Sequence, residues 1–110
     1  MENIKDYTQN LQGWNFTGER PVILDFYATW CGPCKAMSSV VHDIALDYMD
    51  RVDVLKIDIN RNEAFAETCG IQSVPTLFFI RRDGSIVRTV GAMGYGQMKQ
   101  IVEQELLSDH

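Results

Sequence analysis

Apolar residues follow two different periods along this chain, and the change between them predicts strands in some segments and helices in others. Val22 to Tyr27 is a nearly continuous apolar run with β-branched and aromatic residues, typical of a strand buried on both faces of a sheet. From Cys34 to Met49, apolar residues recur every three or four positions. The residues of this stripe are Ala36, Met37, Val40, Val41, Ile44, Ala45 and Tyr48. The stripe predicts a long amphipathic helix directly after the strand.

The second half of the chain divides in the same way. Apolar β-branched runs predict further strands, and periodic segments next to breaking residues predict helices. The expected strands are 52–59, 76–80 and 85–90, and the expected helices are 62–69 and 97–107. Inside the last helix, the inward-facing residues should be Met98, Ile101, Val102 and Leu106. Arg82-Asp83-Gly84 forms a turn between the last two strands, so these strands should make an antiparallel hairpin.

Residues 1–20 have the weakest pattern. Ile4, Tyr7 and Leu11 have helical spacing, which predicts a short first helix. Gly13 and Gly18 then interrupt the pattern. No strand can be recognised before Pro21 from the sequence.

The order of these elements predicts how the sheet is connected. A strand–helix–strand unit requires parallel strands, whereas the hairpin adds antiparallel neighbours. The central sheet should therefore be mixed, with four to five strands and helices packed on it. The 110 residues suit one α/β domain covering residues 1–110 and leave little room for a second.

Composition and charge narrow the possible functions. Apolar residues make up 45% of the chain and charged residues 23%, as in ordinary soluble proteins. The net charge of −5 argues against a sequence-independent nucleic-acid binder. The start of the chain lacks the pattern of a secretory signal, and no apolar run approaches the roughly 18 residues of a membrane span. We expect a cytoplasmic monomer that binds neither nucleic acid nor membrane, although an exported protein without its signal would start in the same way.

The pair Cys31 and Cys34 is the main candidate for chemistry. It lies in Trp30-Cys31-Gly32-Pro33-Cys34, between the first clear strand and the long helix. This spacing at a helix start allows a small disulfide ring to close. Unpaired N–H groups and the positive end of the helix dipole favour a thiolate at Cys31, and the thiolate is the nucleophile in disulfide exchange. Pro33 fits a first helical turn, and Gly32 lets a substrate backbone approach closely.

Two other interpretations of the pair are weaker. Half of a zinc site would need a second pair of ligands, and the remaining Cys69, His42 and His110 have no paired spacing. We therefore expect no metal. A purely structural disulfide would stabilise little, because so short a loop removes little entropy from the unfolded chain.

Several segments, in this order, resemble the thioredoxin family. A Cys-x-x-Cys pair near a strand–helix–strand pattern is typical of that family. The other similar segments are 25–30 (Asp-Phe-Tyr-Ala-Thr-Trp), 74–76 (Val-Pro-Thr), 90–92 (Val-Gly-Ala) and 96–99 (Gly-Gln-Met-Lys). The matches run from about Pro21 to Leu107 and imply the thioredoxin fold. The family often has a proline in the long helix where this chain has Ser39, so the kink that such a proline causes is not expected here.

The resemblance implies roles for two charged residues that interrupt apolar strands. Asp25 would be the proton acceptor for Cys34, since a buried carboxylate tends to be paired or protonated. At an edge position it would simply face water. Lys56 would lie near Asp25 and tune its proton, or would run its stem along apolar surface to reach water.

The resemblance also implies a docking surface for substrates. Pro75 would be cis and would hold the backbone of Val74 beside Cys31, ready to pair with an extended substrate strand. The residues of this surface would be Trp30, Gly32, Pro33, Val74, Pro75, Gly91 and Ala92. Cys69 lies just before this segment, and it is either a small buried apolar residue or a regulatory thiol.

These inferences predict a protein-disulfide reductase. Cys31 would attack a protein disulfide, Cys34 would resolve the mixed disulfide, and the product would be a redox-active Cys31–Cys34 disulfide. No bound cofactor is needed, and by family resemblance a thioredoxin reductase would be the electron donor. Two alternatives keep the fold: an oxidant or isomerase in an oxidising compartment, and a non-catalytic binding subunit that uses the same docking surface. Gly32-Pro33 between the cysteines resembles the reducing members.

Overall fold

The apolar strands form one five-stranded mixed sheet in the computed structural model, which describes residues 4–6 and 16–108. The strands are β1 (Ile4–Asp6), β2 (Val22–Tyr27), β3 (Asp53–Asp58), β4 (Thr76–Ile80) and β5 (Ile86–Val90). Their order across the sheet is β1-β3-β2-β4-β5. β3 runs parallel to β1 and β2, whereas β4 runs antiparallel to β2 and β5. The predicted mixed sheet and its terminal hairpin are confirmed.

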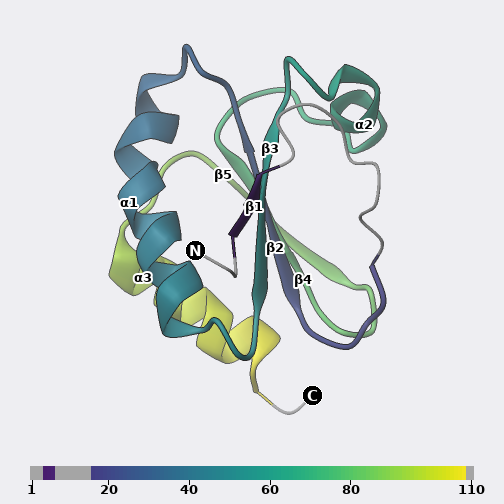
Figure 1. Ribbon diagram of the computed structural model, residues 1–110, viewed down its shortest axis with the longest axis vertical. Helices are drawn as coiled ribbons and strands as arrows, with labels where there is room; N and C mark the ends of the chain where they lie inside the picture. Colours follow the sequence, from purple (N-terminus) through teal and green to yellow (C-terminus); the bar gives the residue numbers. More distant parts are fainter. Residues whose placement is uncertain (1–3, 7–15, 109–110) are drawn as a thin grey trace.

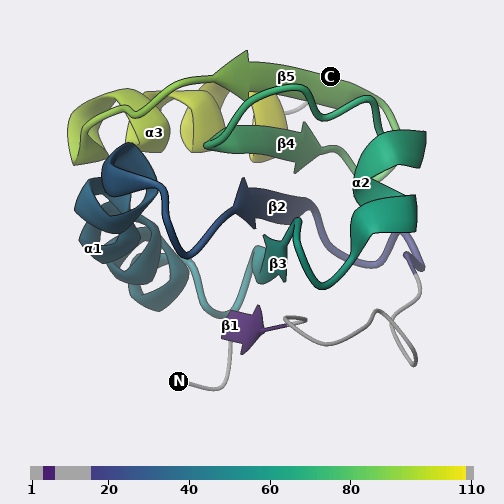
Figure 2. The same cartoon turned by 90° about the horizontal axis from the view of Figure 1, so that it is seen from above.

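Helices cover both faces of this sheet. They are α1 (Gly32–Asp47), α2 (Glu63–Thr68), α3 (Tyr95–Ile101) and the π-helical turn η1 (Val102–Leu106). Figure 2 shows α1 and α3 on one face and α2 on the other. None of the helices in the described part of the chain has the length and apolar character required to cross a bilayer. The arrangement is the thioredoxin fold that the resemblance implied.

Strand alternation sends the side chains of β2 to two separate apolar clusters. Ile23 packs toward α1 and α3, in a cluster that also contains Ile44, Phe79 and Met98. Leu24 and Phe26 pack on the opposite face, under α2. In that second cluster, Phe26 contacts the rings of Phe65 and Phe78, with centroids 6.0 and 5.0 Å away. Because both faces are covered, β2 needs the continuous apolar sequence that predicted it.

Two sequence predictions about local structure in the first half of the chain were wrong. Ile4–Asp6 is a strand and not the start of a helix, since pairing with β3 places Ile4 opposite Val54. Tyr7 and Leu11, which carried the rest of that helical pattern, lie outside the described residues. Ala36 was expected on the buried stripe of α1 but is exposed.

The loops that connect the strands and helices lie at two opposite ends of the sheet. The loops that follow β2 and β3 lie at one end, at the top of Figure 1, together with the start of α1 and with α2. The β4–β5 turn lies at the other end, at the bottom of the figure. In a sheet built this way, the carboxyl ends of β2 and β3 and the amino end of β4 meet at one edge, and the cysteine pair is found there.

Candidate active site

Cys31 caps the first turn of α1 and is bonded to Cys34. Its backbone is extended (φ −90°, ψ 110°), and its Sγ accepts a hydrogen bond from the backbone N–H of Cys34 at 3.1 Å. The two Cα atoms are 5.3 Å apart, and the sulfurs form a disulfide. Pro33 lies in the first turn, where the helix needs no N–H from it. The pair therefore closes a disulfide ring at a helix start, as the spacing predicted, and is not arranged as half of a zinc site.

The cysteine pair is nearly buried although it lies at one end of the sheet. Cys31 is 4% exposed and Cys34 is 8% exposed. Ala28 packs with both, and Val74 closes the cluster from the loop before β4. Neighbouring residues therefore cover most of the surface of both cysteines.

Asp25 lies inside the sheet and not at its edge. In β2 it is the register partner of Lys56 in β3 and of Leu77 in β4, and it is 4% exposed. Alternation places Asp25 on the same face as Ile23, which is the face that α1 covers. The edge interpretation of Asp25 is therefore wrong, because a strand lies on each side of β2.

Lys56 reaches the same region from the neighbouring strand. It is half-buried, and its Nζ lies 4.7 Å from the centroid of the Tyr27 ring, close enough for a cation–π contact. Asp25, Lys56 and Cys34 all line one cavity of about 360 Å³. The remaining polar lining of this cavity comes from Tyr27, Thr29, Lys35 and Ser38. The structure therefore brings the acid, the lysine and the second cysteine together, as the resemblance implied.

The predicted docking residues gather around the cysteine pair. The Val74–Pro75 peptide bond is cis. Gly91 has φ +95°, a conformation that favours glycine, and its N–H donates to the Pro75 carbonyl at 2.9 Å. This hydrogen bond ties the loop after β5 to the segment before β4, so Gly91 and Val74 belong to one surface. Ala92 is exposed next to Gly91.

Trp30 forms the other side of this surface, and a residue that sequence reasoning missed positions it. Trp30 is 68% exposed, yet its indole Nε1 donates to Asn60 Oδ1 at 3.1 Å. The Asn60 N–H in turn donates to Oδ1 of Asp58, which is 3% exposed. The sequence signal that could have indicated Asn60 is a polar side chain directly after the predicted buried strand 52–59. Gly32 and Pro33 are exposed beside Trp30.

Cys69 is the one free cysteine in residues 16–108, and it lies apart from the bonded pair. It caps the C-terminus of α2 and packs against the apolar cluster under that helix. Burial raises the pKa of the Cys69 thiol, and the nearby Arg88 guanidinium lowers this pKa by a smaller amount. The environment is that of a half-buried apolar residue. Within the described residues, no group of three or more His, Cys, Asp or Glu side chains is arranged to hold a metal ion.

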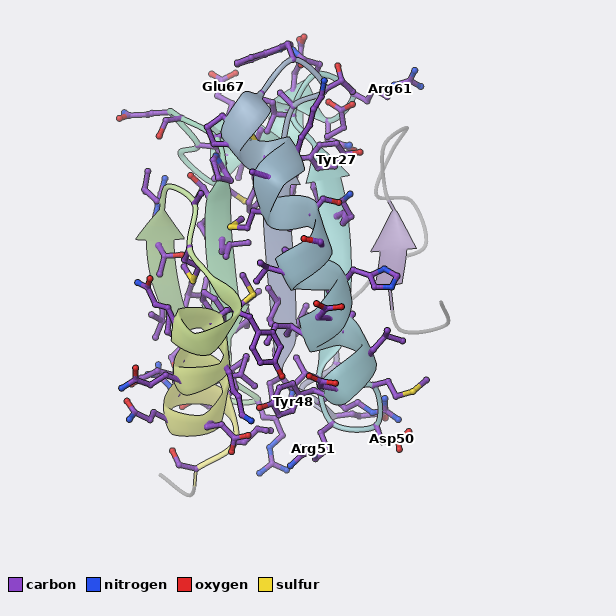
Figure 3. The ribbon with its side chains drawn as sticks, turned by 90° about the vertical axis from the view of Figure 1, so that its left-hand side faces the viewer. Tyr27, Tyr48, Asp50, Arg51, Arg61 and Glu67 are labelled. Atoms are coloured by element: carbon purple, nitrogen blue, oxygen red, sulfur yellow. A yellow bond between two sulfur atoms is a disulfide. The ribbon has the colours of Figure 1, made fainter. Side chains whose placement is uncertain are left out.

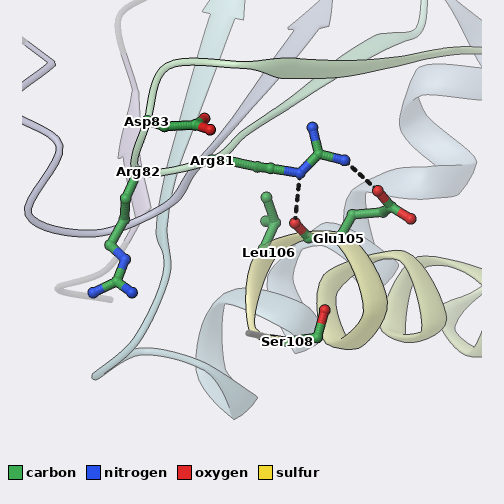
Figure 4. A pocket seen from close by; sticks show the side chains of 6 residues that line it. All are labelled: Arg81, Arg82, Asp83, Glu105, Leu106 and Ser108. Atoms are coloured by element: carbon green, nitrogen blue, oxygen red, sulfur yellow. Dashed lines mark hydrogen bonds and ion pairs between the residues drawn. The ribbon is translucent and has the colours of Figure 1, made fainter. Parts of the chain in front are cut away.

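A second cluster of charged residues, which the sequence did not predict, lies at the opposite end. Arg81 donates from Nε to the Glu105 carbonyl at 3.0 Å and forms an ion pair with the Glu105 carboxylate (Figure 4). In the neighbouring turn, the Ser85 N–H and Oγ donate to Asp83, and these bonds lower the pKa of Asp83. The Arg81–Glu105 contacts tie the end of β4 to η1.

Comparisons with known proteins agree with this geometry. The thioredoxin family model matches residues 3–104. Thioredoxin from Borreliella burgdorferi is 37% identical over 100 residues, which cover 91% of this chain and 85% of that protein. Thioredoxin-1 of Drosophila melanogaster is 36% identical over 92 residues, covering 84% and 83%. The crystal structure of chloroplastic thioredoxin z superposes with a TM-score of 0.83 at 30% identity, covering 93% of each chain.

Proposed function

This chain belongs to the thioredoxin family, and from that premise we propose that it reduces disulfide bonds in other proteins. The family match and the bonded Cys31–Cys34 pair make it a protein thiol-disulfide oxidoreductase. The observation that carries the proposal is the position of this pair at the first turn of α1, beside the docking residues. The redox-active group is the disulfide of the protein itself, and the reaction requires no bound cofactor or metal.

The proposed reaction has two exchange steps. The Cys31 thiolate attacks one sulfur of a substrate disulfide, and the other substrate sulfur leaves as a thiolate that takes up a proton. Cys34 then loses its proton and attacks the Cys31 sulfur, which releases the first substrate sulfur as a second thiol. Two electrons pass to the substrate, and Cys31–Cys34 becomes a disulfide. The Cys34 N–H directed at the Cys31 Sγ supports Cys31 as the nucleophile, because this donor would stabilise a thiolate there.

Asp25 is proposed as the acceptor of the Cys34 proton, and Lys56 as a residue that tunes Asp25. Asp25, Lys56 and Cys34 line the same cavity, through which a proton could pass from Cys34 to Asp25. Asp25 is nearly buried in the central strand of the sheet. Lys56 is its register partner on the adjacent strand and supplies a positive charge there.

The segments around the cysteines are proposed to bind an extended substrate segment. Val74 would pair with substrate backbone next to the attacked sulfur. Trp30, Gly32 and Pro33 would border the segment on the α1 side, and Pro75, Gly91 and Ala92 on the β4–β5 side.

The cellular setting is proposed on family resemblance. A flavoprotein thioredoxin reductase would restore the dithiol, and protein disulfides would be the substrates. We place the protein in the cytoplasm, as one domain spanning residues 1–110 that acts as a monomer without nucleic acid or membrane.

The reduction potential of the Cys31–Cys34 pair tests the direction of the reaction. Equilibration in defined thiol buffers should give a value near the roughly −270 mV typical of thioredoxins. A value above about −200 mV would assign the protein to isomerases and oxidants, and would overturn both the proposed direction and the cytoplasmic location. The double replacement of Cys31 and Cys34 by serine tests the alternative of a binding subunit. If the unmodified protein reduced no disulfide and the double variant still bound its partner, the protein would be a binding subunit.

A further inference from the structure

Cationic side chains gather on one side of the active site, although the whole chain has a net charge of −5. Lys35 and Lys56 line the cavity beside Cys34. Arg61 follows Asn60, the residue that holds the Trp30 indole. Figure 3 shows Arg61 directed outward at the end of the molecule where Tyr27 lies. We call Lys35, Lys56 and Arg61 the cationic side of the site.

Two of these cations are available to a partner. Lys35 and Arg61 are both exposed. The ion pairs described within residues 16–108, Arg20–Asp53 and Arg81–Glu105, lie at the opposite end of the sheet and involve neither residue. The Glu67 carboxylate is also at the site end, but Figure 3 shows it on the other side of the α1 start from Arg61.

The cavity beside Cys34 combines a mainly apolar lining with two lysines, Lys35 and Lys56. The two lysines supply positive charge beside the cysteine pair. The acid in this cavity is the nearly buried Asp25. A volume of about 360 Å³ leaves room for an acidic side chain.

We propose that the preferred substrates are protein disulfides with an Asp or Glu within about two residues of the attacked cysteine, whose carboxylate lies against the cationic side of the site. An extended segment advances about 3.3 Å per residue, so a side chain one or two residues from the substrate sulfur reaches this side. This inference rests on the proposed reductase function and specifies its substrate class. Because the cations lie on one side, the carboxylate also orients the segment and so selects which of the two substrate sulfurs is attacked.

Three matched peptides, each closed by one disulfide, test the substrate class. They differ only in carrying Glu, Gln or Lys on both flanks of one cysteine. The second-order rate constant for reduction by the reduced protein is measured for each peptide and divided by its rate constant with dithiothreitol, which removes the effect of the charge on the peptide's own sulfur. The Glu peptide should be preferred over the Gln peptide by about twofold to fivefold, and the Lys peptide should be the slowest. Salt at 0.5 M should reduce these differences.

Variants with a single change of charge assign the effect to its location. Lys35→Gln and Arg61→Gln should each lower the Glu-to-Gln rate ratio, and the double variant should bring it close to one. Arg82→Gln removes the same charge from an exposed position at the opposite end and should leave the ratio unchanged. For each variant, the rate constant with the Glu peptide is divided by the rate constant with the Gln peptide. A change in Cys31 reactivity that affects both peptides equally therefore cancels from this ratio.

The outcomes separate this inference from the function on which it rests. Equal normalised rates for all three peptides, or a Glu preference that survives the double variant, would overturn the substrate class while leaving the reductase intact. Failure to reduce any of the peptides would instead count against the reductase function. The salt dependence of the unmodified protein requires no variant, so the inference is tested even if a variant folds poorly.

A trapping experiment tests the predicted orientation. With Cys34→Ser, the first exchange step should stop at a mixed disulfide between Cys31 and the peptide. Mass spectrometry should find Cys31 joined mainly to the substrate cysteine that has Glu on its flanks. An equal distribution over both substrate cysteines would show that the cationic side does not orient the segment.

Discussion

The two ends of the sheet differ in how they use charge. At the β4–β5 end, Arg81 is bound by Glu105, and Asp83 accepts two hydrogen bonds from Ser85. At the cysteine end, Lys35 and Arg61 are exposed and take no part in the ion pairs described for residues 16–108. Arg81 and Asp83 are thus held by local partners, whereas Lys35 and Arg61 are exposed beside the cysteine pair.

The same contrast holds for polar groups that are buried. Tyr48, toward the far end of α1, is 3% exposed, and its hydroxyl donates to Glu103 at 2.5 Å. Burial and this carboxylate raise the pKa of Tyr48, so the hydroxyl stays protonated and serves structure. Asp25 is equally buried but lies against a cavity beside a reactive cysteine. The two buried polar groups therefore differ in whether the packing leaves space next to them.

The largest effect should come from the cysteine pair. Cys31→Ser removes the nucleophile and should lower the rate of protein-disulfide reduction by roughly a thousandfold or more. The assay follows reduction of a protein disulfide by the reduced protein. Cys69→Ser, which changes a thiol outside the pair, is the matched control and should keep most of the activity. Loss of activity in both variants to the same extent would contradict the assignment of the nucleophile.

Replacing Asp25 should give the next largest effect. Asp25→Asn removes the proposed proton acceptor and should slow release of the mixed disulfide by roughly a hundredfold at neutral pH. The difference should shrink as the pH rises, because hydroxide can then deprotonate Cys34. Stopped-flow measurement of the second exchange step checks this. Asp83→Asn, at the other end, should leave that step unchanged, and a pH-independent defect in Asp25→Asn would indicate a structural role only.

Cys69 provides a thiol in a different environment for comparison. Its raised pKa means that folding favours the protonated form, so its contribution to stability is complete below the unfolded pKa and is lost as pH rises above about 8.5. At pH 8, iodoacetamide should alkylate Cys69 in the oxidised, folded protein about threefold to tenfold more slowly than in the unfolded protein. The difference in free energy of unfolding between the unmodified protein and Cys69→Ala should decrease above pH about 8.5. Equal alkylation rates would contradict the burial of this thiol.

The smallest effect should come from the charges at the far end. Glu105→Ala breaks the partly exposed pair with Arg81 and should lower the free energy of unfolding by about 0.5–1 kcal/mol. High salt should reduce this loss, and disulfide reduction should be unaffected. Urea unfolding with and without salt measures it. A change in activity as large as the change in stability would show that the two ends are coupled.

The strands of the fold could be predicted closely where the apolar pattern was continuous. The bounds of β2 and β4 agree with the predicted runs, because strands covered on both faces need apolar residues throughout. β1 could not be predicted, since three residues at the edge of a sheet leave too short a pattern and its pairing with β3 is a long-range contact. The end of the last helix was predicted as α-helical, but 102–106 forms a π turn, whose Leu107 N–H donates to the Val102 carbonyl.

The candidate site could be predicted from the sequence where a residue type at a given spacing is typical of one kind of chemistry. The Cys31–Cys34 spacing indicated the disulfide, and the resemblance indicated Asp25, Lys56 and the cis Pro75. Asn60 was missed because its role depends on where the Trp30 indole points, which no local pattern records. The pairing of Arg81 with Glu105 joins residues 24 positions apart, so it also required the structure.

The central position of β2 in the sheet has a consequence for synthesis of the chain. Cys31 and Cys34 leave the ribosome well before Val74, Pro75 and Gly91, because the order of translation follows the sequence. Until those later residues arrive, β2 lacks β4 on one side, and the wall that Val74 supplies around the cysteine pair is missing. A nascent chain therefore carries both cysteines before the residues that cover them in the folded protein have been made.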